Sequence, residues 1–476
     1  MKLDRWDPIL LWYARAVAVM RARPLNDPTS WRYQAAIHDY IRQIDPLATP
    51  GDVMPSMAEQ QRFWRQCQHS TWFFLPWHRM YLSCFERIVA AAVVSLGGPD
   101  DWALPYWNYS PDQADARRIP RAFRDAQTPD GVPNPLRITN RNPGVNSGGV
   151  VADDDEVDIE VCLSEPSFVA RSTGGNPGFG GPRTLFNHGG GAVGFLEQTP
   201  HGDVHVAVGG WMGRFNTAGL DPLFWLHHAN IDRLWTVWQR RDPLHADPAD
   251  AQWLTGVSFD FHDETGAAVT MTSDQVMDTT VVPLLYEYDD VTDPLAAGGT
   301  RGPRRGAQMA EEAPVPEMVG ATDQPIVLTG KTESASVPVT APAGPGRSRG
   351  AAAAPGRVYL NIENITGEGE PTSYAVYVNL PPGADPAEHR DLFAGILPMF
   401  GVAEATRSDA AHPGSGLQYS LEVSRVVRTL EARNDWDPAT VRVTFVPRRR
   451  SVASESSRAA AAADPIQVGR VSVYFA

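Results

Sequence analysis

The first chemical signal in this chain is a pair of histidines four residues apart, in the segment His201-Gly-Asp-Val-His205. Residues at this spacing lie on one face of a helix, one turn apart, so both imidazoles can reach a single metal ion. Surface histidines often have the same spacing by chance. The pair alone is therefore an ambiguous signal.

The residue after the first of these histidines weighs against a zinc hydrolase. The zinc-protease pattern His-Glu-x-x-His places a glutamate there as general base, whereas this chain has Gly202. The identity of the metal then depends on the other ligands. A site made of imidazoles alone suits copper, zinc, iron or nickel.

Two further segments contain histidines in suggestive positions. In Asp221-Pro-Leu-Phe-Trp-Leu-His-His-Ala-Asn-Ile-Asp-Arg-Leu-Trp235, His228 and Asp232 are again four residues apart, and an aspartate at that spacing can orient an imidazole. Upstream, Cys67-Gln-His69 is followed by Pro76-Trp-His78. His78 could also be a helix-start residue, and Cys67 an inert buried thiol.

Taken together, these segments resemble the tyrosinase and polyphenol oxidase family of type 3 copper proteins, over residues 31–288. The segment Asp221–Trp235 is the most specific part of the likeness. The resemblance implies two copper ions that react with dioxygen as co-substrate. It assigns three ligands to the first copper and three to the second: His38, His69 and His78, then His201, His205 and His228.

The choice between the neighbouring His227 and His228 also follows from the resemblance, because the second histidine of such a pair is the ligand in the family. His227 is left with a packing or supporting role. Cys67 stands two residues before His69, where many relatives form a thioether bond between cysteine and histidine. The same bond is implied here, and it would hold the His69 ring rigid.

The resemblance assigns residues to the substrate site as well. Phe215 lies thirteen residues before the last ligand, where the family has a phenylalanine that stacks over the substrate ring. Glu197 lies four residues before His201, where relatives carry a glutamate that orders a water. Gly202 and Val206 complete the predicted substrate site.

Asn230 and Asp232, which follow the last ligand His228 in the chain, are predicted to support the histidines from behind. The motif Tyr286-Glu-Tyr288 resembles the tyrosine motif that closes the catalytic domain of the family.

The implied reaction is the oxidation of small o-diphenols to o-quinones, with dioxygen reduced to water. Hydroxylation of a monophenol also needs the phenol to be deprotonated, and a water ordered by Glu197 could serve as base. In many hydroxylating relatives an asparagine occupies the position of Gly202, which here has no side chain and opens the pocket entrance. Diphenol oxidation is therefore predicted ahead of monophenolase (monooxygenase) activity, which stays open.

The C-terminal half extends the resemblance. Phe393-Ala-Gly-Ile-Leu-Pro-Met-Phe400 and the closing residues 469–475 look like the C-terminal domain of plant-type enzymes and bacterial relatives. In that group the domain lies over the copper site and keeps the enzyme latent, as in a zymogen. The resemblance implies a latent enzyme here, with Leu397, Met399 or Phe400 as a plug in the pocket. The alternative is a domain that merely stabilises the fold.

Hydrophobic periodicity indicates the elements that must position the histidines. Residues 110–185, rich in Pro, Gly, Asn and Asp, are expected to form long loops. The predicted fold is a mainly α N-terminal domain, in which a four-helix bundle holds the dicopper core. Its helices are expected in two pieces over 8–45, from Pro76 to Gly97, around His201 and His205, and from an N-cap at Asp221 with Pro222 at the first position.

Beyond residue 288 the composition changes to a linker and then to short strands. The predicted division is a catalytic domain over 1–288, a linker over 289–322 and an all-β sandwich over 323–476. Two low-complexity insertions, 341–356 and 448–464, interrupt the sandwich. Strands are expected over 358–365, 373–380, 441–446 and 470–475.

Composition narrows the classes of partner. A formal net charge of -15 argues against nucleic acid or an anionic membrane as partner, and no apolar run is long enough for a membrane span. Three cysteines do not describe a disulfide framework. Without a recognisable signal peptide the protein is expected to be cytoplasmic, although export carried by a partner protein stays open, as does the oligomeric state.

Two other classes of protein remain as alternatives. A haemocyanin-like dioxygen carrier would use the same six histidines, but a single 52 kDa chain without repeats disfavours it. A zinc hydrolase built on His201 and His205 is less favoured still, because it leaves the ligands of the first copper unexplained.

Overall fold

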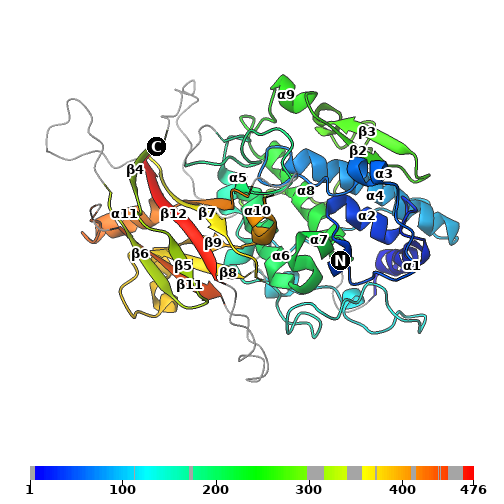
Figure 1. Ribbon diagram of the computed structural model, residues 1–476, viewed down its shortest axis with the longest axis horizontal. Coiled ribbons are helices and arrows are strands. Elements are labelled where there is room, and N and C mark those ends of the chain that lie inside the picture. The colour runs from blue at the N-terminus through cyan, green and yellow to red at the C-terminus, as the bar shows by residue number, and fades with distance from the viewer. Residues whose placement is uncertain are drawn as a thin grey trace.

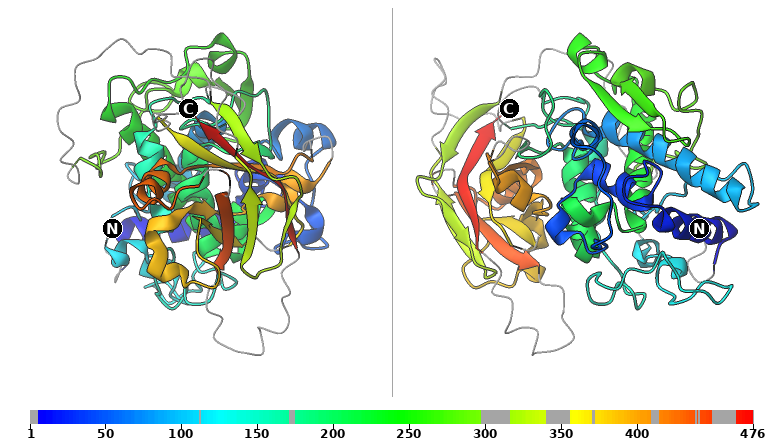
Figure 2. Two further views of the ribbon diagram at one scale, coloured as in Figure 1. Left: turned by 90° about the vertical axis from the view of Figure 1, so that its left-hand side faces the viewer. Right: turned by 45° about the vertical axis from the view of Figure 1, so that its right-hand side comes forward.

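A computed structural model shows a helical N-terminal part beside a C-terminal part built on two β-sheets (Figure 1). Turned views show the sheets on one side of the molecule and the long helices on the other (Figure 2). The structure describes residues 6–111, 113–170, 175–296, 316–339, 356–369, 372–408, 414–437, 439, 441–448 and 465–475.

Two long helices run through the N-terminal part. Helix α4 (Phe74–Ser95) and helix α8 (Leu223–Arg241) contact one another, and α4 also contacts α1 (Pro8–Ala22). The shorter helices of this part are α2 (Trp31–His38), α3 (Met57–Phe63), α5 (Glu160–Ser164), α6 (Asp203–Val208), α7 (Phe215–Ala218) and α9 (Ala251–Leu254).

Helix starts follow the sequence signals with small shifts. Asp7 and Ser30 cap α1 and α2, each accepting a hydrogen bond from a backbone N–H of the first turn. Helix α8 begins one residue later than predicted, with Pro222 before its first residue. Asp221 still accepts a hydrogen bond from the Leu223 N–H at 2.9 Å, so the aspartate acts on the helix start as expected.

The stretch 110–185 consists of loops as predicted, interrupted by α5 and short 3-10 turns. A hairpin of β2 (Ser258–His262) and β3 (Ala268–Thr272) closes the helical part near α3. The 3-10 turns among the described residues are η1 (Arg42–Ile44), η2 (Ala114–Arg117), η3 (Arg121–Phe123), η4 (Asp155–Val157), η6 (Gly210–Gly213), η7 (Ser273–Val276) and η8 (Pro386–Leu392).

The larger C-terminal sheet has the order β1-β10-β7-β12-β4, with β5 also paired to β12. The smaller sheet has the order β6-β11-β8-β9. Side chains of both sheets meet in one hydrophobic core. The strands are β4 (Glu317–Ala321), β5 (Ile326–Leu328), β6 (Glu333–Val337), β7 (Val358–Thr366), β8 (Ser373–Val378), β9 (Phe393–Leu397), β10 (Leu417–Glu422), β11 (Val441–Arg448) and β12 (Ile466–Phe475).

The sequence expectation for this part needs two corrections. It is not purely β, because α10 (Val402–Thr406) and α11 (Ser424–Ala432) pack against its strands. The predicted linker 289–322 is also too long, since β4 lies inside it and pairs with the end of β12. Residues 297–315 of that linker, and nearly all of both low-complexity insertions, lie outside the described residues.

The two parts of the molecule are joined by backbone as well as side-chain contacts. Strand β1 (Gly191–Ala192) belongs to the N-terminal part but pairs in parallel with β10 of the C-terminal part. Ion pairs across the boundary join Arg390 to Asp155 and Arg448 to Asp153. The C-terminal part is thereby held against the segment that leads to His201.

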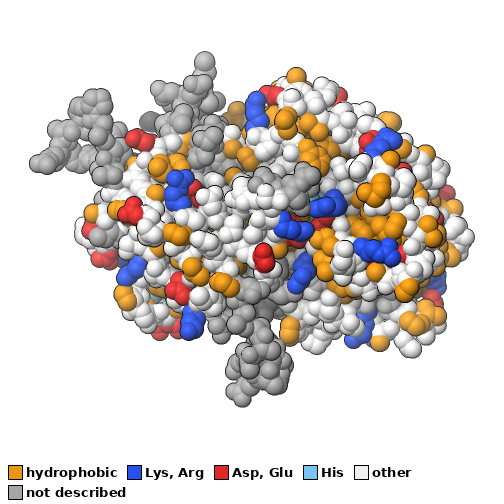
Figure 3. Space-filling model, in the orientation of Figure 1, with side chains coloured by type: hydrophobic (Ala, Val, Ile, Leu, Met, Phe, Trp, Pro, Cys, Tyr) orange, Lys and Arg blue, Asp and Glu red, His pale blue; other side chains and the backbone are white. Residues whose placement is uncertain are grey.

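The outer surface mixes charges. On the face shown in Figure 3, acidic and basic side chains are interspersed, with hydrophobic side chains scattered between them. Among the helices that the structure describes, none has the length and apolar character needed to cross a bilayer.

Candidate metal centre

Six buried histidines converge between α2, α4, α6 and α8 in the N-terminal part. Together with a seventh histidine, His227, they form two groups, and within each group the potential ligand atoms lie within 4.8 Å of one another. His38 ends α2, His69 lies in the loop before α4, and His78 is in the first turns of α4. The second group contains His201, His205, His227 and His228.

The second group is built on a break in helical geometry. His201 lies in a π-helical turn, η5 (Glu197–Gly202), which runs directly into α6 with His205. His228 comes from the middle of α8. Such π turns recur at functional sites because they reorient side chains within a helix.

Four of the six imidazoles are anchored through Nδ1 to a backbone carbonyl. His78 Nδ1 donates to the Phe74 carbonyl at 2.8 Å, and His201 Nδ1 donates to the Glu197 carbonyl at 3.0 Å. A hydrogen bond at Nδ1 fixes the tautomer and leaves the Nε2 lone pair free for a metal. The remaining anchored pairs are His38 with Phe215 at 2.9 Å and His205 with Met212 at 2.7 Å.

The histidines of the centre have the protonation state and the free nitrogen atoms that a metal site requires. The buried Nε2 atoms of His38, His69, His78, His201 and His227 have no hydrogen-bond partner, a cost that folded proteins rarely accept without a ligand. Burial lowers the pKa of His38 to about 4 and that of His201 to about 3. Neutral imidazoles are the form that binds metal, so the residues fit a pair of copper ions.

His69 is held differently from the other ligands. Neither ring nitrogen of this buried residue has a hydrogen-bond partner. The predicted thioether partner, Cys67, is buried, and its Sγ lies 3.2 Å from Nδ1 of His188. His188 in turn lies 3.6 Å from the Asp39 carboxylate. His188 and Asp39 could not be predicted from the sequence, because neither stands at a recognisable ligand spacing.

His227 is the fourth member of the second group, next to His228 in the chain. Its Nδ1 is 3.0 Å from the Tyr109 hydroxyl, and its ring stacks on His201 at 5.5 Å between centroids. Asn230, predicted to support the ligands, accepts a hydrogen bond from Arg233 at 3.3 Å. Tyr109, like His188 and Asp39, is a residue that the sequence did not reveal.

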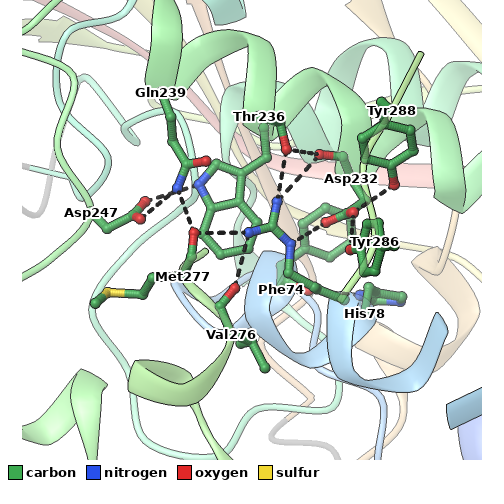
Figure 4. A network of polar contacts seen from close by, with 12 residues as sticks. Phe74, His78, Asp232, Thr236, Gln239, Asp247, Val276, Met277, Tyr286 and Tyr288 are labelled. Carbon is green, nitrogen blue, oxygen red and sulfur yellow. Dashed lines mark hydrogen bonds and ion pairs between the residues drawn. The ribbon is translucent and has the colours of Figure 1, made fainter. Parts of the chain in front are cut away.

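Asp232 stands at the centre of a buried polar network (Figure 4). One oxygen accepts from Arg79 Nε at 2.5 Å, and the other accepts from the hydroxyls of Tyr286 and Tyr288 at 2.5 and 2.6 Å. The Arg79 guanidinium also lies 3.7 Å from the Trp235 ring centroid. The network ties α4, α8 and the predicted tyrosine motif together directly behind the histidines.

The residues predicted around the substrate are brought together. Glu197 accepts the Ser70 N–H with both carboxylate oxygens, at 2.9 and 3.0 Å, and burial raises its pKa to about 8. The Phe215 ring lies 4.3 Å from that of His69. Val206 is buried on α6, and its carbonyl accepts from Asn142 at 2.9 Å.

One side chain of the C-terminal part enters the centre. The Phe400 ring stacks on the His205 ring, with centroids 4.0 Å apart and an interplanar angle of 9°. It also lies 4.7 Å from the Phe215 ring. The other two plug candidates, Leu397 and Met399, are buried in the core shared by the C-terminal sheets.

Little space remains beside the histidines. The cavity lined by Glu197, Gly202, Phe215 and Phe400 measures about 10 Å³, which is at the lower limit for a single water. A phenol ring does not fit. A buried, histidine-only centre for two metal ions, covered by a second part of the same chain, is the class of site that the structure defines.

Comparison with known proteins agrees with this class. Residues 28–241 match the common central domain of tyrosinase, 247–297 match the polyphenol oxidase middle domain, and 315–476 match a domain of unknown function. A tyrosinase of Hahella sp. (strain CCB-MM4) is 36% identical, over 98% of this chain and 97% of its own length. A chloroplastic polyphenol oxidase of Malus domestica is 28% identical, over 81% and 66%.

Solved structures show the same fold. A latent apple tyrosinase superposes with a TM-score of 0.60 at 25% identity, covering 100% of this chain and 98% of its own. A latent aurone synthase superposes with a TM-score of 0.60 at 24% identity, covering 99% and 88%. The chain belongs to the tyrosinase and polyphenol oxidase family, and it is a type 3 copper oxidoreductase that oxidises phenols with dioxygen.

Proposed function

We propose that this enzyme is a polyphenol oxidase held latent by Phe400, with one copper on His38, His69 and His78 and the other on His201, His205 and His228. The observation that carries the latency is the stacking of Phe400 on His205 at 4.0 Å. A substrate ring that approached His205 would have to take the place of the Phe400 ring.

Copper would supply dioxygen binding and the transfer of electrons from the phenol. The chain's own residues do the rest. Phe215, 5.8 Å from His38 and 4.3 Å from His69, presents an aromatic face against which a substrate ring can stack once Phe400 leaves. The four Nδ1 anchors keep the imidazoles in place, so the site needs no reorganisation when substrate arrives.

Glu197 is proposed to hold the water that accepts the phenolic proton. Its carboxyl group lines the residual cavity beside Gly202 and is held by the Ser70 N–H. A nearby cation lowers the pKa of a carboxyl group, so copper binding favours the carboxylate form needed for this role. Gly202 contributes no side chain to the water, which favours diphenol oxidation over monophenol hydroxylation.

A thioether between Cys67 and His69 remains part of the proposal. It is supported by the spacing of the two residues and by the lack of any hydrogen-bond anchor on the His69 ring. Cys67 Sγ lies 3.2 Å from Nδ1 of His188 in this structure.

The architecture can be proposed in finer terms. Helices α2, α4, α6 and α8 form the four-helix frame of the copper site, and the two C-terminal sheets pack as a sandwich, supported by the core that they share. The catalytic domain extends past residue 288, because Asp290 and Asp293 bind Arg233 and Arg241. The C-terminal domain begins before β4.

The test is oxygen uptake by the copper-loaded full-length protein with paired mono- and diphenols, before and after mild detergent. We expect low turnover before detergent and a large increase after it. Phe400→Ala should raise the basal turnover, whereas Phe475→Ala, a half-buried aromatic residue at the end of β12, should not. Equal turnover with and without detergent would refute the latency.

A further inference from the structure

Gly202 is in unusually close contact with the C-terminal part. A Cβ atom placed on Gly202 would lie 2.9 Å from Cγ and 3.3 Å from Cβ of Pro398. Real Cβ atoms are almost never found closer than about 3 Å to a heavy atom, because the contact is strongly repulsive. The closed form therefore requires a residue without a side chain at position 202.

Pro398 has little freedom to move away. It lies between Leu397 and Met399, which are both fully buried, and the carbonyl of Ile396 accepts a hydrogen bond from Gln198 at 3.0 Å. Pro398 belongs to the turn that follows β9 and also contains Gly401, which we call the Pro398 turn. The backbone at Gly401 lies against the Phe215 ring, so closely that a Cβ atom on Gly401 would lie 2.5 Å from that ring. A proline ring also has no rotamers with which to yield.

The backbone of Gly202 itself does not call for glycine. Its φ and ψ of -63° and -38° are those of a right-handed helix, where alanine is intrinsically preferred over glycine. The close approach of Pro398 thus accounts for a glycine that the local helix disfavours.

The same residue borders the substrate pocket. Gly202 lines the residual cavity together with Glu197, His201 and Phe400. A side chain at this position would point both at the water proposed to sit on Glu197 and at the turn that carries Phe400.

We propose that Gly202 couples substrate selection to latency: any side chain that adjusts the pocket at this position also lifts the Pro398 turn and opens the enzyme. The inference rests on the proposed latency. A substitution of Gly202 that changes the preference between mono- and diphenols should therefore also weaken the closed state. Only a compensating change of Pro398 would separate the two effects.

The experiment compares copper-loaded full-length wild type with Gly202→Ala. Diphenol turnover is measured before and after mild detergent, and the ratio of the two values reports latency. We expect the ratio of basal to detergent-activated turnover of Gly202→Ala to rise about tenfold or more, the range that overpacking of a tight contact produces. Because it is a ratio, it separates loss of latency from any effect of the new methyl group on turnover itself. Amide exchange at Val193, whose N–H is bonded to Gln418 in the closed form, should become faster.

Two variants make the test specific. Gly202→Ala combined with Pro398→Ala removes the 2.9 Å contact and should restore most of the latency. Gly213→Ala is the matched control, because the nearest atom to its new Cβ is the His205 carbonyl oxygen at 4.0 Å, and it should leave the ratio unchanged. If Gly202→Ala fails to fold, Pro398→Phe adds bulk from the other side of the contact and should raise basal turnover in the same way.

The outcomes separate the two claims. Absence of detergent activation in the wild type would overturn the latency itself. A latent wild type together with an equally latent Gly202→Ala would overturn only the coupling. The coupling would also fail if the basal turnover of Gly202→Ala rose and Pro398→Ala did not reverse it.

Discussion

The two histidine triads use the same side chain but anchor it in different ways. His78 and His201 each bond Nδ1 to the carbonyl four residues earlier, which a helical turn supplies automatically. His69 comes from a loop, and neither of its ring nitrogens is bonded. His78 and His201 thus gain their orientation from the local backbone, whereas His69 needs another restraint.

Each triad nevertheless contains one imidazole whose Nδ1 is unpartnered: His69 in the first and His228 in the second. The His228 ring stacks on His78 at 4.5 Å and 11°, and α8 behind it is fixed by Asp232. In the second triad, packing of the His228 ring takes the place of the hydrogen bond. In the first triad, a covalent bond from Cys67 to His69 is predicted to take its place.

The largest expected effect comes from removing an anchored ligand. His78→Ala should lower the copper content from near two to near one per chain and cut diphenol turnover by on the order of 10³-fold, because a catalytic metal contributes several kcal/mol to the transition state. Metal analysis and oxygen uptake measure this. His389→Ala in the C-terminal part is the control, and an unchanged copper content in His78→Ala would contradict the assignment.

A smaller effect is expected on the support behind the second triad. Asp232→Asn leaves the Arg79 guanidinium buried without its carboxylate, which costs about 3–5 kcal/mol of unfolding free energy. Denaturant titration measures the loss. Asp260→Asn, which removes an exposed pair with Arg62, should cost no more than about 1 kcal/mol. Equal losses in the two variants would show that the network is not a support.

Removal of the predicted thioether should weaken the binding of the first copper ion and leave the binding of the second unchanged. Cys67→Ser is expected to reduce the affinity for that ion by about 10–100-fold, the usual range for groups that orient a metal ligand. Mass spectrometry of the wild-type peptide should show the loss of two hydrogen atoms. Cys162→Ser serves as control, since the Cys162 thiol already bonds to the Ile159 carbonyl. A free thiol at Cys67 in the copper-loaded enzyme would exclude the bond.

The smallest effect concerns the choice of substrate. Gly202→Asn adds an amide that can polarise the water on Glu197, and one such hydrogen bond is worth about 1 kcal/mol. The ratio of monophenolase to diphenolase activity should therefore rise by a few-fold. Because the same substitution strains the Pro398 turn, the ratio has to be measured after detergent. An unchanged ratio would remove position 202 from the control of hydroxylation.

Much of the metal centre could be predicted through the resemblance to a known family, which the segment Asp221–Trp235 carries most specifically; the spacing of His201 and His205 alone was ambiguous. His188 and Tyr109 could not be predicted, since they reach the centre through long loops whose path has no periodic pattern. For the side chain proposed to fill the pocket, the sequence offered three candidates and no means to choose between them. The choice of Phe400 depends on the turn around it, where Met399 and Gly401 have positive φ angles of 51° and 78°, and no pattern in the sequence encodes that turn.

The general fold was predictable where strands are long and apolar, as in β7 and β12. The two-residue strand β1 was not, because Gly191 and Ala192 have no strand preference and pair only with a neighbour far away in the chain. Helices α10 and α11 were overlooked within a region that reads as strands. Tertiary contacts, rather than local propensity, decide these elements.

The pairing of β1 with β10 also has a mechanical consequence. Two backbone hydrogen bonds, from the Gly191 N–H to the Gly416 carbonyl at 2.7 Å and from the Val193 N–H to the Gln418 carbonyl at 3.0 Å, cross the boundary a few residues upstream of Glu197. A force that pulls the C-terminal part away is transmitted along this short strand to the π turn that carries His201. Displacement of the C-terminal part and the position of the wall of the active site are therefore mechanically coupled through β1.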